Sequence, residues 1–321
     1  MSRGDVMAVR ARLGPAQLVL TASVARRYYI DGKTKIEIAD ELALSRFKVA
    51  RLLEDARSSG LVRIEIGHPG EVDVALSADL RDAFHLRHSL VVDTLEEEPA
   101  ALRGLIGAAA AELLSEIVTA EDVLGLGWAR SLISMRSHLR SLAACSVVQL
   151  TGALAQPGVD DSSIDLVRDV ARIAGGPAYL FYAPMIVPDS AAALLALPEV
   201  ARAIGRFASV TKAVVGIGGW QPPHSTLYDA ISPSDRRTLA EAGVHADVSG
   251  VLLDSDGAPV TAALNDRIIG IHAAQLKQIP EVIALAYGIE KATAARAAIR
   301  GGYITSLITH TAFARALLAA G

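Results

Sequence analysis

Cysteine, long apolar runs and several common catalytic motifs are scarce or absent in this 321-residue chain. Its single cysteine, Cys145, excludes an intrachain disulfide framework and any zinc cluster built from several thiolates. No apolar segment of signal-peptide length precedes the charged residues near the start. The alanine-rich stretch GLIGAAAAELLSEIV is interrupted by Glu112 and Glu116 and is too short to span a bilayer. We therefore expect a soluble, cytoplasmic protein with no membrane partner.

Neither positive nor negative charge is in large excess over the whole chain, but the two signs are unevenly distributed along it. The net charge is −4, yet residues 1–66 hold 12 Lys/Arg against 8 Asp/Glu, whereas the remainder holds 19 against 27. A basic segment ahead of an acidic body suggests an anionic partner for the first segment. With 51% hydrophobic residues the chain can bury a large core, and its length suggests two or three domains.

The first segment contains three helical patterns and one strand pattern. Apolar residues recur at helical spacing in 16–30, where we expect Leu18, Ala22, Ala25 and Tyr29 to share the inner face. A second helix is predicted from Thr34 to about residue 42, with Glu37 completing a capping box, and a third from its cap at Ser45 to about residue 58. Period-two alternation in 61–66 predicts a short strand, suited to a wing.

The second and third predicted helices have the spacing of a helix-turn-helix. Ala39 is small where the two must pass closely, and Ala43 lies in the turn. Basic residues then fall on the exposed amino-terminal half of the third helix, the part that a helix-turn-helix inserts into the DNA major groove. The alternative is an ordinary helical hairpin with a solvated charged face. The residues expected to contact duplex operator DNA are Thr34, Lys35, Ser45, Arg46, Phe47, Lys48 and Arg51.

Glycine and proline at 67–71 mark a boundary, which predicts a DNA-binding domain over 1–67 and a second domain over 68–321. In the second domain, apolar strand patterns alternate with helical ones, as in a mostly parallel α/β sheet covered on both faces. Strands are predicted at 89–93, 122–127, 145–152, 178–184, 212–218, 248–254, 267–272, 281–288 and 303–309. Helices are predicted at 100–118, from 129, at 162–175, at 289–302 and at the carboxyl end. The acidic run EEEP at 96–99 is expected to be a solvated loop.

Two strand-to-helix junctions of this domain favour a ligand site, because ligands of open α/β sheets bind beyond the carboxyl ends of strands. The first is GLGWARS, where Gly125 and Gly127 permit a sharp turn, and Trp128, Ala129, Arg130 and Ser131 begin a helix whose free N–H groups suit an anion. A glycine turn used only for packing explains this stretch equally well. The second is YGIEKATAA, where Lys291 lies against the helix dipole unless an anion justifies it or its side chain bends out to water.

The residues of both domains resemble the SorC family of bacterial transcriptional regulators, which respond to sugars. The resemblance rests on YYIDGKTKIEIADELALSRFKVARLLEDARSSGLVRIEI in the head, and on GLGWARSL, VVQLTG, ADVSGVLLDSDG, LNDRIIGI and EKATAARAAIRGGYITSLIT in the body. It implies a winged helix-turn-helix followed by an α/β domain similar in fold to ribose-phosphate isomerases and glucosamine-phosphate deaminases. It also implies that Gly127 to Ser131 and Lys291 hold a phosphate, and that Asp247 holds sugar hydroxyls.

The chain departs from the family pattern at several of these positions. Ala129 stands where the family often has glycine, Ser131 where it often has threonine, and His310 where it usually has aspartate. Because a methyl at 129 could crowd a phosphate, the effector is expected to be a sugar phosphate, an unphosphorylated sugar or a polyol. Family members usually form homo-oligomers, so a homodimer or homotetramer is expected.

The resulting function is a DNA-binding regulator of carbohydrate metabolism, with no enzymatic activity. The alternative is a sugar-phosphate isomerase or deaminase, which needs a general base on the substrate. The sequence contains neither a GxSxG nucleophile motif nor an HExxH metal pair. A binding module whose head serves only protein contacts is a third possibility, and salt-dependent DNA affinity would separate it from a regulator.

Overall fold

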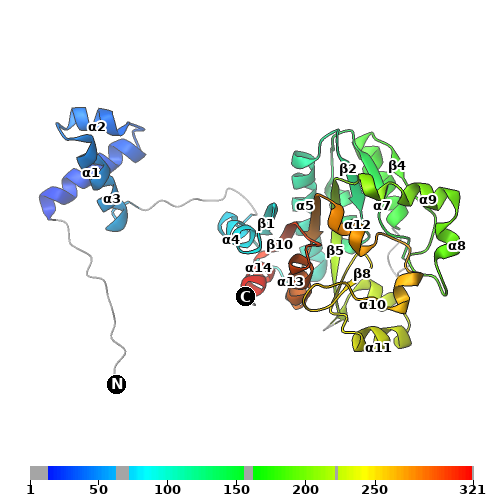
Figure 1. Cartoon of the computed structure of the whole chain (residues 1–321). Helices are drawn as coiled ribbons and strands as arrows, with labels where there is room; N and C mark the ends of the chain where they lie inside the picture. Colours follow the sequence, from blue (N-terminus) through cyan, green and yellow to red (C-terminus); the bar gives the residue numbers. More distant parts are fainter. Residues whose placement is uncertain (1–13, 63–71, 155–161, 221–222, 320–321) are drawn as a thin grey trace, which may run out of the picture. The chain divides into compact units, whose positions relative to one another are not determined.

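The computed structural model of the protein describes residues 14–62, 72–154, 162–220 and 223–319 (Figure 1). The chain separates into two compact units, residues 1–67 and 68–321. Each has its own hydrophobic core.

The head unit contains three helices, α1 (Pro15–Tyr29), α2 (Lys35–Glu41) and α3 (Arg46–Ser58). The capping box is present: Thr34 Oγ1 accepts a hydrogen bond from the Glu37 N–H, and the Glu37 carboxylate accepts one from the Thr34 N–H. Ser45 Oγ accepts a hydrogen bond from the Lys48 N–H at 3.2 Å and so caps α3. The turn between α2 and α3 passes through Ala43, whose φ of 52° lies in the left-handed region. The helices bury a shared core made of Val24, Ala25, Ile38, Ala39, Val49, Leu52, Leu53 and Ala56.

The buried face of α1 differs from the prediction. Thr21, Val24 and Ala25 are buried, whereas Leu18 and Tyr29 are exposed. The buried face is shifted because α1 packs on α3 and, to a smaller extent, on α2, and its buried residues join the core shared with these helices. Residues 63–66 of the predicted wing strand lie outside the described residues.

The body unit is built on a sheet of the order β1-β10-β9-β5-β2-β3-β4, in which all of these neighbours are parallel. From β2 the chain runs outward through β3 and β4 and returns as β5 on the other side of β2, so the direction of winding changes between β2 and β5. The mostly parallel α/β fold is thereby confirmed. The strands are β1 (His88–Val92), β2 (Val123–Leu126), β3 (Ser146–Gln149), β4 (Ala178–Tyr179), β5 (Lys212–Trp220), β9 (Glu281–Leu285) and β10 (Ser306–His310).

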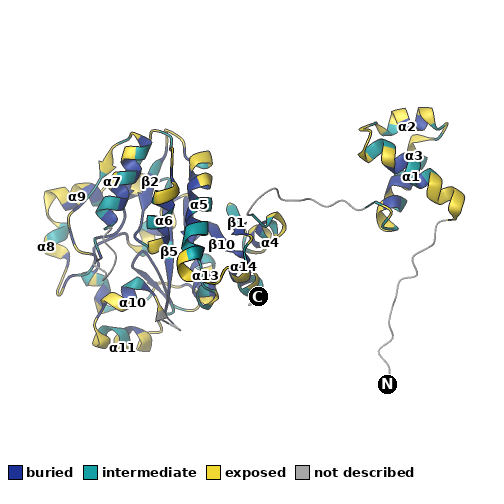
Figure 2. Cartoon of the chain, turned by 180° about the vertical axis from the view of Figure 1, so that it is seen from behind, coloured by how far each residue is buried: buried dark blue, intermediate teal, exposed yellow. Residues whose placement is uncertain are grey.

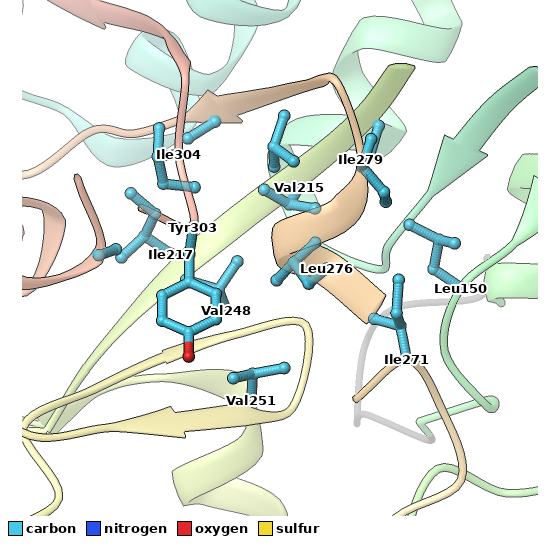
Figure 3. Close-up of a cluster of buried hydrophobic side chains, with 14 of the residues drawn as sticks. Leu150, Val215, Ile217, Val248, Val251, Ile271, Leu276, Ile279, Tyr303 and Ile304 are labelled. Atoms are coloured by element: carbon cyan, nitrogen blue, oxygen red, sulfur yellow. The ribbon is translucent and has the colours of Figure 1, made fainter. Parts of the chain in front are cut away.

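Helices cover both faces of this sheet, and Figure 2 shows strands that are mostly buried beneath helices with exposed outer sides. On one face pack α5 (Pro99–Ile117), α6 (Arg130–His138) and α7 (Ser163–Ala174). The opposite core receives side chains from α4 (Val74–Phe84), α9 (Pro198–Ile204), α12 (Ala273–Gln278), α13 (Ala292–Arg300) and α14 (Thr311–Ala319). Successive residues of a strand point to opposite faces of the sheet, so β5 contributes side chains to both cores. Val214 packs in the core with α5, α6 and α7, whereas Val215 lies beside Leu276 and Ile279 in the opposite core (Figure 3).

The second half of β5 extends beyond its parallel neighbours and pairs with antiparallel strands instead. These are β6 (Pro223–His224) and β7 (Ala246–Val248), and β7 pairs in turn with β8 (Val251–Leu253). The prediction of one strand over 248–254 was wrong, because Ser249 and Gly250 form a turn with positive φ between two strands. The remaining helices of this unit are short: α8 (Ala192–Leu195), α10 (Thr226–Ala230), α11 (Pro233–Glu241), and the 3-10 helices η1 (Phe207–Ser209), η2 (Ala263–Arg267) and η3 (Ile289–Lys291).

The predicted strand at 267–272 was also wrong. Ile268, Ile269 and Ile271 are buried, but within the described residues this segment makes only single bridges, through Ile268 to Ile186 and through Gly270 to Thr151. The apolar residues of this segment are therefore buried, but the segment does not pair with a neighbouring strand over its length. Over the part of the chain that the structure describes, we find no helix with the length and apolar character needed to cross a bilayer.

Candidate DNA-contacting surface and effector cavity

The amino-terminal half of α3 presents a basic surface in the head unit. Arg46 and Arg51 are exposed and Lys48 is half-buried. Within residues 14–62 none of the three forms an ion pair with a carboxylate, whereas Arg27 and Lys33 both pair with Glu41. The three side chains are thus available to an outside anion.

The remaining predicted head residues have mixed roles. Thr34 and Ser45 use their side-chain oxygens as helix caps, which leaves backbone N–H groups at the starts of α2 and α3 as phosphate donors. Lys35 approaches the ring of Tyr28, with its Nζ 5.8 Å from the centroid. Phe47 projects into solvent and is 87% exposed.

The body unit contains a cavity of about 380 Å³ at the carboxyl ends of β2, β5 and β9. These strands are neighbours in the order β9-β5-β2, so their following loops meet at one edge of the sheet. The volume lies in the range of small-molecule sites. Six of the eight predicted effector residues line the cavity: Trp128, Ala129, Arg130, Ser131, Asp247 and Lys291.

Gly125 and Gly127 do not line this cavity. Gly125 lies inside β2, where an added Cβ would come within 3.0 Å of Leu150 and Val210. The Gly127 N–H donates to the Val214 carbonyl at 3.0 Å, and a Cβ there would collide with the Ser249 hydroxyl. The two glycines therefore allow close packing beneath the site, and they lie outside the set of residues that line it.

One side of the cavity is cationic. Lys291 from η3 and Arg130 from α6 are joined there by Arg103 from the first turns of α5. Two cations lie over the ring of Tyr287: Lys291 Nζ is 4.6 Å from the ring centroid, and the Arg103 guanidinium carbon is 5.7 Å from it. The start of α6 also lines the cavity through Ala129, Arg130 and Ser131. Its N-cap residue Ala129 supplies no side-chain hydrogen bond to the helix N–H groups.

The pKa of the Lys291 ammonium is lowered, chiefly because the group is partly withdrawn from water. Glu290 and Asp247 oppose this shift. The nearby charges of Arg130 and Arg103 add to it. The three cations and the start of α6 supply positive charge and hydrogen-bond donors on this side, and the Glu290 carboxylate beside Lys291 offsets part of that charge.

The other side of the cavity is centred on the buried carboxylate of Asp247 in β7. Trp220 Nε1 donates a hydrogen bond to Asp247 Oδ1 at 3.1 Å, and the Ser225 hydroxyl donates to the same oxygen. Gly218 lies opposite Asp247 in the β5–β7 pair, and any side chain there would collide with the Asp247 carboxylate. Burial raises the pKa of Asp247, while the hydrogen bonds and the charge of Lys291 counteract that rise.

Several lining residues were missed by sequence reasoning, among them Arg103, Tyr287, Ser225 and Glu97. Glu97 belongs to the acidic run predicted to be a solvated loop, and the adjacent Glu98 caps α5 by accepting a hydrogen bond from the Ala101 N–H. Glu97 and Arg103 could have been found from the junction between β1 and α5, which is another strand-to-helix junction of the same sheet.

Ala129 and His310, two departures from the family pattern, lie close to this cavity. The Ala129 methyl faces β5, since a Cβ on Gly216 would come 2.6 Å from it. His310 is buried behind the β9–η3 loop, where its Nε2 accepts a hydrogen bond from the Gly288 N–H at 3.4 Å. Burial lowers the pKa of His310. Among the described residues, no group of three or more His, Cys, Asp or Glu side chains could hold a metal ion.

Comparisons with known proteins agree with this architecture. Residues 68–319 match the family model described as "Putative sugar-binding domain". The transcriptional regulator LsrR of Klebsiella pneumoniae is 31% identical over 323 residues, covering 96% of this chain and 95% of LsrR. The uncharacterized transcriptional regulator YjhU of Escherichia coli K12 is 29% identical, covering 91% of this chain and 92% of YjhU.

Among solved structures, the full-length sorbitol operon regulator SorC of Klebsiella pneumoniae has a TM-score of 0.71 and 22% identity, covering 94% of this chain and 99% of SorC. A domain of a possible sugar-binding transcriptional regulator from Arthrobacter aurescens has a TM-score of 0.70 and covers 78% of this chain. These two structural similarities show a shared fold. The family model and the relatives aligned over nearly the full length show the family to which the chain belongs. The chain belongs to the SorC family of sugar-responsive, DNA-binding transcriptional regulators.

Proposed function

We propose that this regulator binds an anionic sugar derivative, of which a sugar phosphate is the simplest, in the cavity beyond β2, β5 and β9. The observation that carries this proposal is the convergence of Arg103, Arg130 and Lys291 beside the uncapped start of α6. Glu290 and Asp247 offset part of the positive charge on Lys291, and a phosphate would offset more of the charge of the cluster and accept hydrogen bonds at the start of α6, which a neutral sugar could not match.

The hydroxyl groups of the same ligand are assigned to the Asp247 side of the cavity. Its Oδ1 already accepts two hydrogen bonds from the protein, and a carboxylate has about four acceptor sites in all, so capacity remains for ligand hydroxyls. Gly218 keeps this carboxylate close to the sheet, where it faces the cavity with Ser225. An anionic end and a hydroxyl-rich end would thus be recognised by opposite sides of one pocket.

The head unit is proposed to bind operator DNA through α3. Arg46, Lys48 and Arg51 supply the charges for phosphates and guanine edges, and the capped start of α3 supplies backbone donors. Such a regulator works where operator DNA is present, in the cytoplasm. A homodimer or homotetramer would present several heads, and the effector would act by binding one arrangement of the assembly better than another.

A thermal-stability screen tests the effector assignment. We expect sugar phosphates to raise the melting temperature of the full-length protein, and the parent sugars and polyols to raise it less, because a ligand of the native state stabilises by mass action. Lys291→Ala should remove the difference between phosphorylated and parent compounds.

The matched control is Lys277→Ala, which removes an exposed lysine that stacks on Tyr303 of the body unit and does not line the cavity. It should keep the wild-type ranking of ligands. Equal stabilisation by a sugar and by its phosphate, or a ranking unchanged by Lys291→Ala, would remove the basis for an anionic effector. Turnover of a sugar phosphate by the purified protein would favour the isomerase or deaminase alternative.

A further inference from the structure

The apolar side chain that is most exposed in the described head residues is Phe47, at 87%. It is the second residue of α3, whose other large apolar side chains, Val49, Leu52 and Leu53, are buried in the head core. Leaving a phenylalanine in water forgoes the stabilisation that its burial would give. Its position therefore calls for a partner outside the head core.

The neighbours of Phe47 are the cations of the proposed DNA surface. Arg46 and Lys48 flank it in sequence, and Arg51 follows at i+4, on the same side of α3. Between Phe47 and Arg51, the small Ala50 adds only a methyl group to the helix surface. The ring thus stands clear at the edge of a basic surface whose charges suit a nucleic acid.

The chemistry of the major groove restricts what such a ring can recognise. The base edges there present hydrogen-bond donors and acceptors, with one apolar exception, the C5 methyl of thymine. A phenyl ring has neither a donor nor an acceptor, so contact with a polar base edge would be unfavourable. Contact with a thymine methyl removes apolar surface of both partners from water.

We propose that Phe47 reads a thymine methyl in each half of the operator and so fixes part of its sequence. This inference rests on the proposed insertion of α3 into the major groove. In the proposed complex, Arg46, Lys48 and Arg51 position α3 on the DNA. Phe47 adds a preference for thymine that a charged side chain at position 47 would not give.

The test begins with the full-length protein and a library of random double-stranded DNA, from which bound duplexes are selected. Each thymine of the selected duplex is then replaced by deoxyuridine, which removes only the methyl group. For the wild type we expect one replacement per half-site to weaken binding roughly three- to ten-fold, the size associated with one buried methyl group.

Phe47→Ala should bind the parent duplex more weakly and lose the sensitivity to that replacement, while Phe47→Leu should keep part of it. Val19→Ala, which truncates a 70%-exposed side chain on α1, should retain the wild-type sensitivity. The proposal is overturned if no single replacement weakens wild-type binding, or if Phe47→Ala is as sensitive as the wild type. Failure to select any duplex would instead contradict DNA binding itself, so the two failures are distinguishable.

Discussion

At the scale of single residues, Asp247 combines a functional position with an energetic cost. It is 7% exposed, and burial raises its pKa, which means that the folded protein disfavours the ionised form. Hydrogen bonds from Ser225 and Trp220 reduce this cost. A buried carboxylate kept beside a cavity, against the preference of the fold, is typical of a ligand-binding role.

We predict that Asp247→Asn stabilises the ligand-free protein and weakens effector binding. Because the folded-state pKa is raised, ionisation of Asp247 subtracts stability as the pH rises above its unfolded value. Removing the charge should therefore raise the free energy of unfolding at pH 7. Loss of a charged acceptor for ligand hydroxyls should weaken effector binding about ten-fold or more.

Thermal unfolding and ligand titration check both effects. Asp256→Asn is the control, because Asp256 is exposed and pairs with Arg300 outside the cavity. It should change neither quantity appreciably. A destabilised Asp247→Asn protein with unchanged effector affinity would contradict the assignment.

The sequence predicted part of the cavity at this scale. Asp247, Lys291 and residues 128–131 could be assigned because they follow strands or match a family motif. Arg103 could not, since its contribution depends on how far α5 reaches from β1 toward β9, which no local pattern encodes. Gly125 and Gly127 were also expected at the site but lie outside the cavity lining, because a glycine needed for close packing leaves the same sequence signal as one needed for ligand approach.

At the scale of secondary-structure elements, the turn between α2 and α3 contains a strained residue. Ala43 has a φ of 52°, a conformation in which a Cβ costs about 1–2 kcal/mol. Ala43→Gly should therefore raise the stability of the head by about 0.5–1 kcal/mol, after the extra flexibility that glycine gives the unfolded chain is deducted. Hydrogen exchange of α2 and α3 amides in the full-length protein measures this.

Ala50→Gly provides the comparison for Ala43→Gly, because it makes the same chemical change in the middle of α3. There glycine should lower stability by about 1 kcal/mol. If both substitutions shift amide protection in the same direction, the left-handed strain at Ala43 is not the governing factor.

A second element-scale feature is the ion pair at the amino ends of β2 and β5. Lys212 Nζ donates to both Asp122 oxygens, at 2.8 and 2.9 Å, and Thr211 Oγ1 donates to one of them. Burial alone would raise the pKa of Asp122, but the hydrogen bonds from Lys212 and Thr211 outweigh it and lower the pKa to about 2. The ionised pair therefore joins adjacent strands at the edge opposite the cavity.

Since the folded pKa of Asp122 is depressed, its stabilisation is present above the unfolded value near 3.8 and is lost as the pH falls toward 2. Asp122→Asn should cost about 2 kcal/mol at pH 7, and this difference from the wild type should shrink between about pH 4 and pH 2. Urea unfolding followed by the fluorescence of Trp128 and Trp220 reports on this unit. Asp82→Asn removes an exposed carboxylate and should have little effect. A pH-independent loss would refute the electrostatic explanation.

Helices were more predictable than strands at this scale. The caps at Thr34 and Ser45 fixed the starts of α2 and α3, because a cap leaves a local signature. The β7–β8 hairpin was missed although Ser249 and Gly250 form an S-G pair typical of turns. The segment 267–272 is buried but does not form a strand. Its hydrophobic side chains indicate burial, whereas strand pairing depends on residues far away in the sequence.

At the scale of the whole molecule, alternating strands and helices predicted the layered α/β body, and the helix-turn-helix spacing predicted the fold of the head helices. In the proposed homodimer or homotetramer, the way effector binding in one unit alters DNA binding by the other would depend on the arrangement of the copies. No pattern in one chain specifies that arrangement. The two activities can nevertheless be separated, because their candidate residues lie in different compact units.

The central claim is tested most directly by measuring the affinity of the selected operator duplex with and without a stabilising sugar phosphate. Removing Arg46 and Arg51 together should weaken DNA binding about ten-fold or more while the effector still raises the melting temperature. Arg57→Ala, at the other end of α3, should have little effect. Lys291→Ala should bind DNA normally and lose the response to the effector. DNA affinity left unchanged by the loss of both Arg46 and Arg51 would contradict the account.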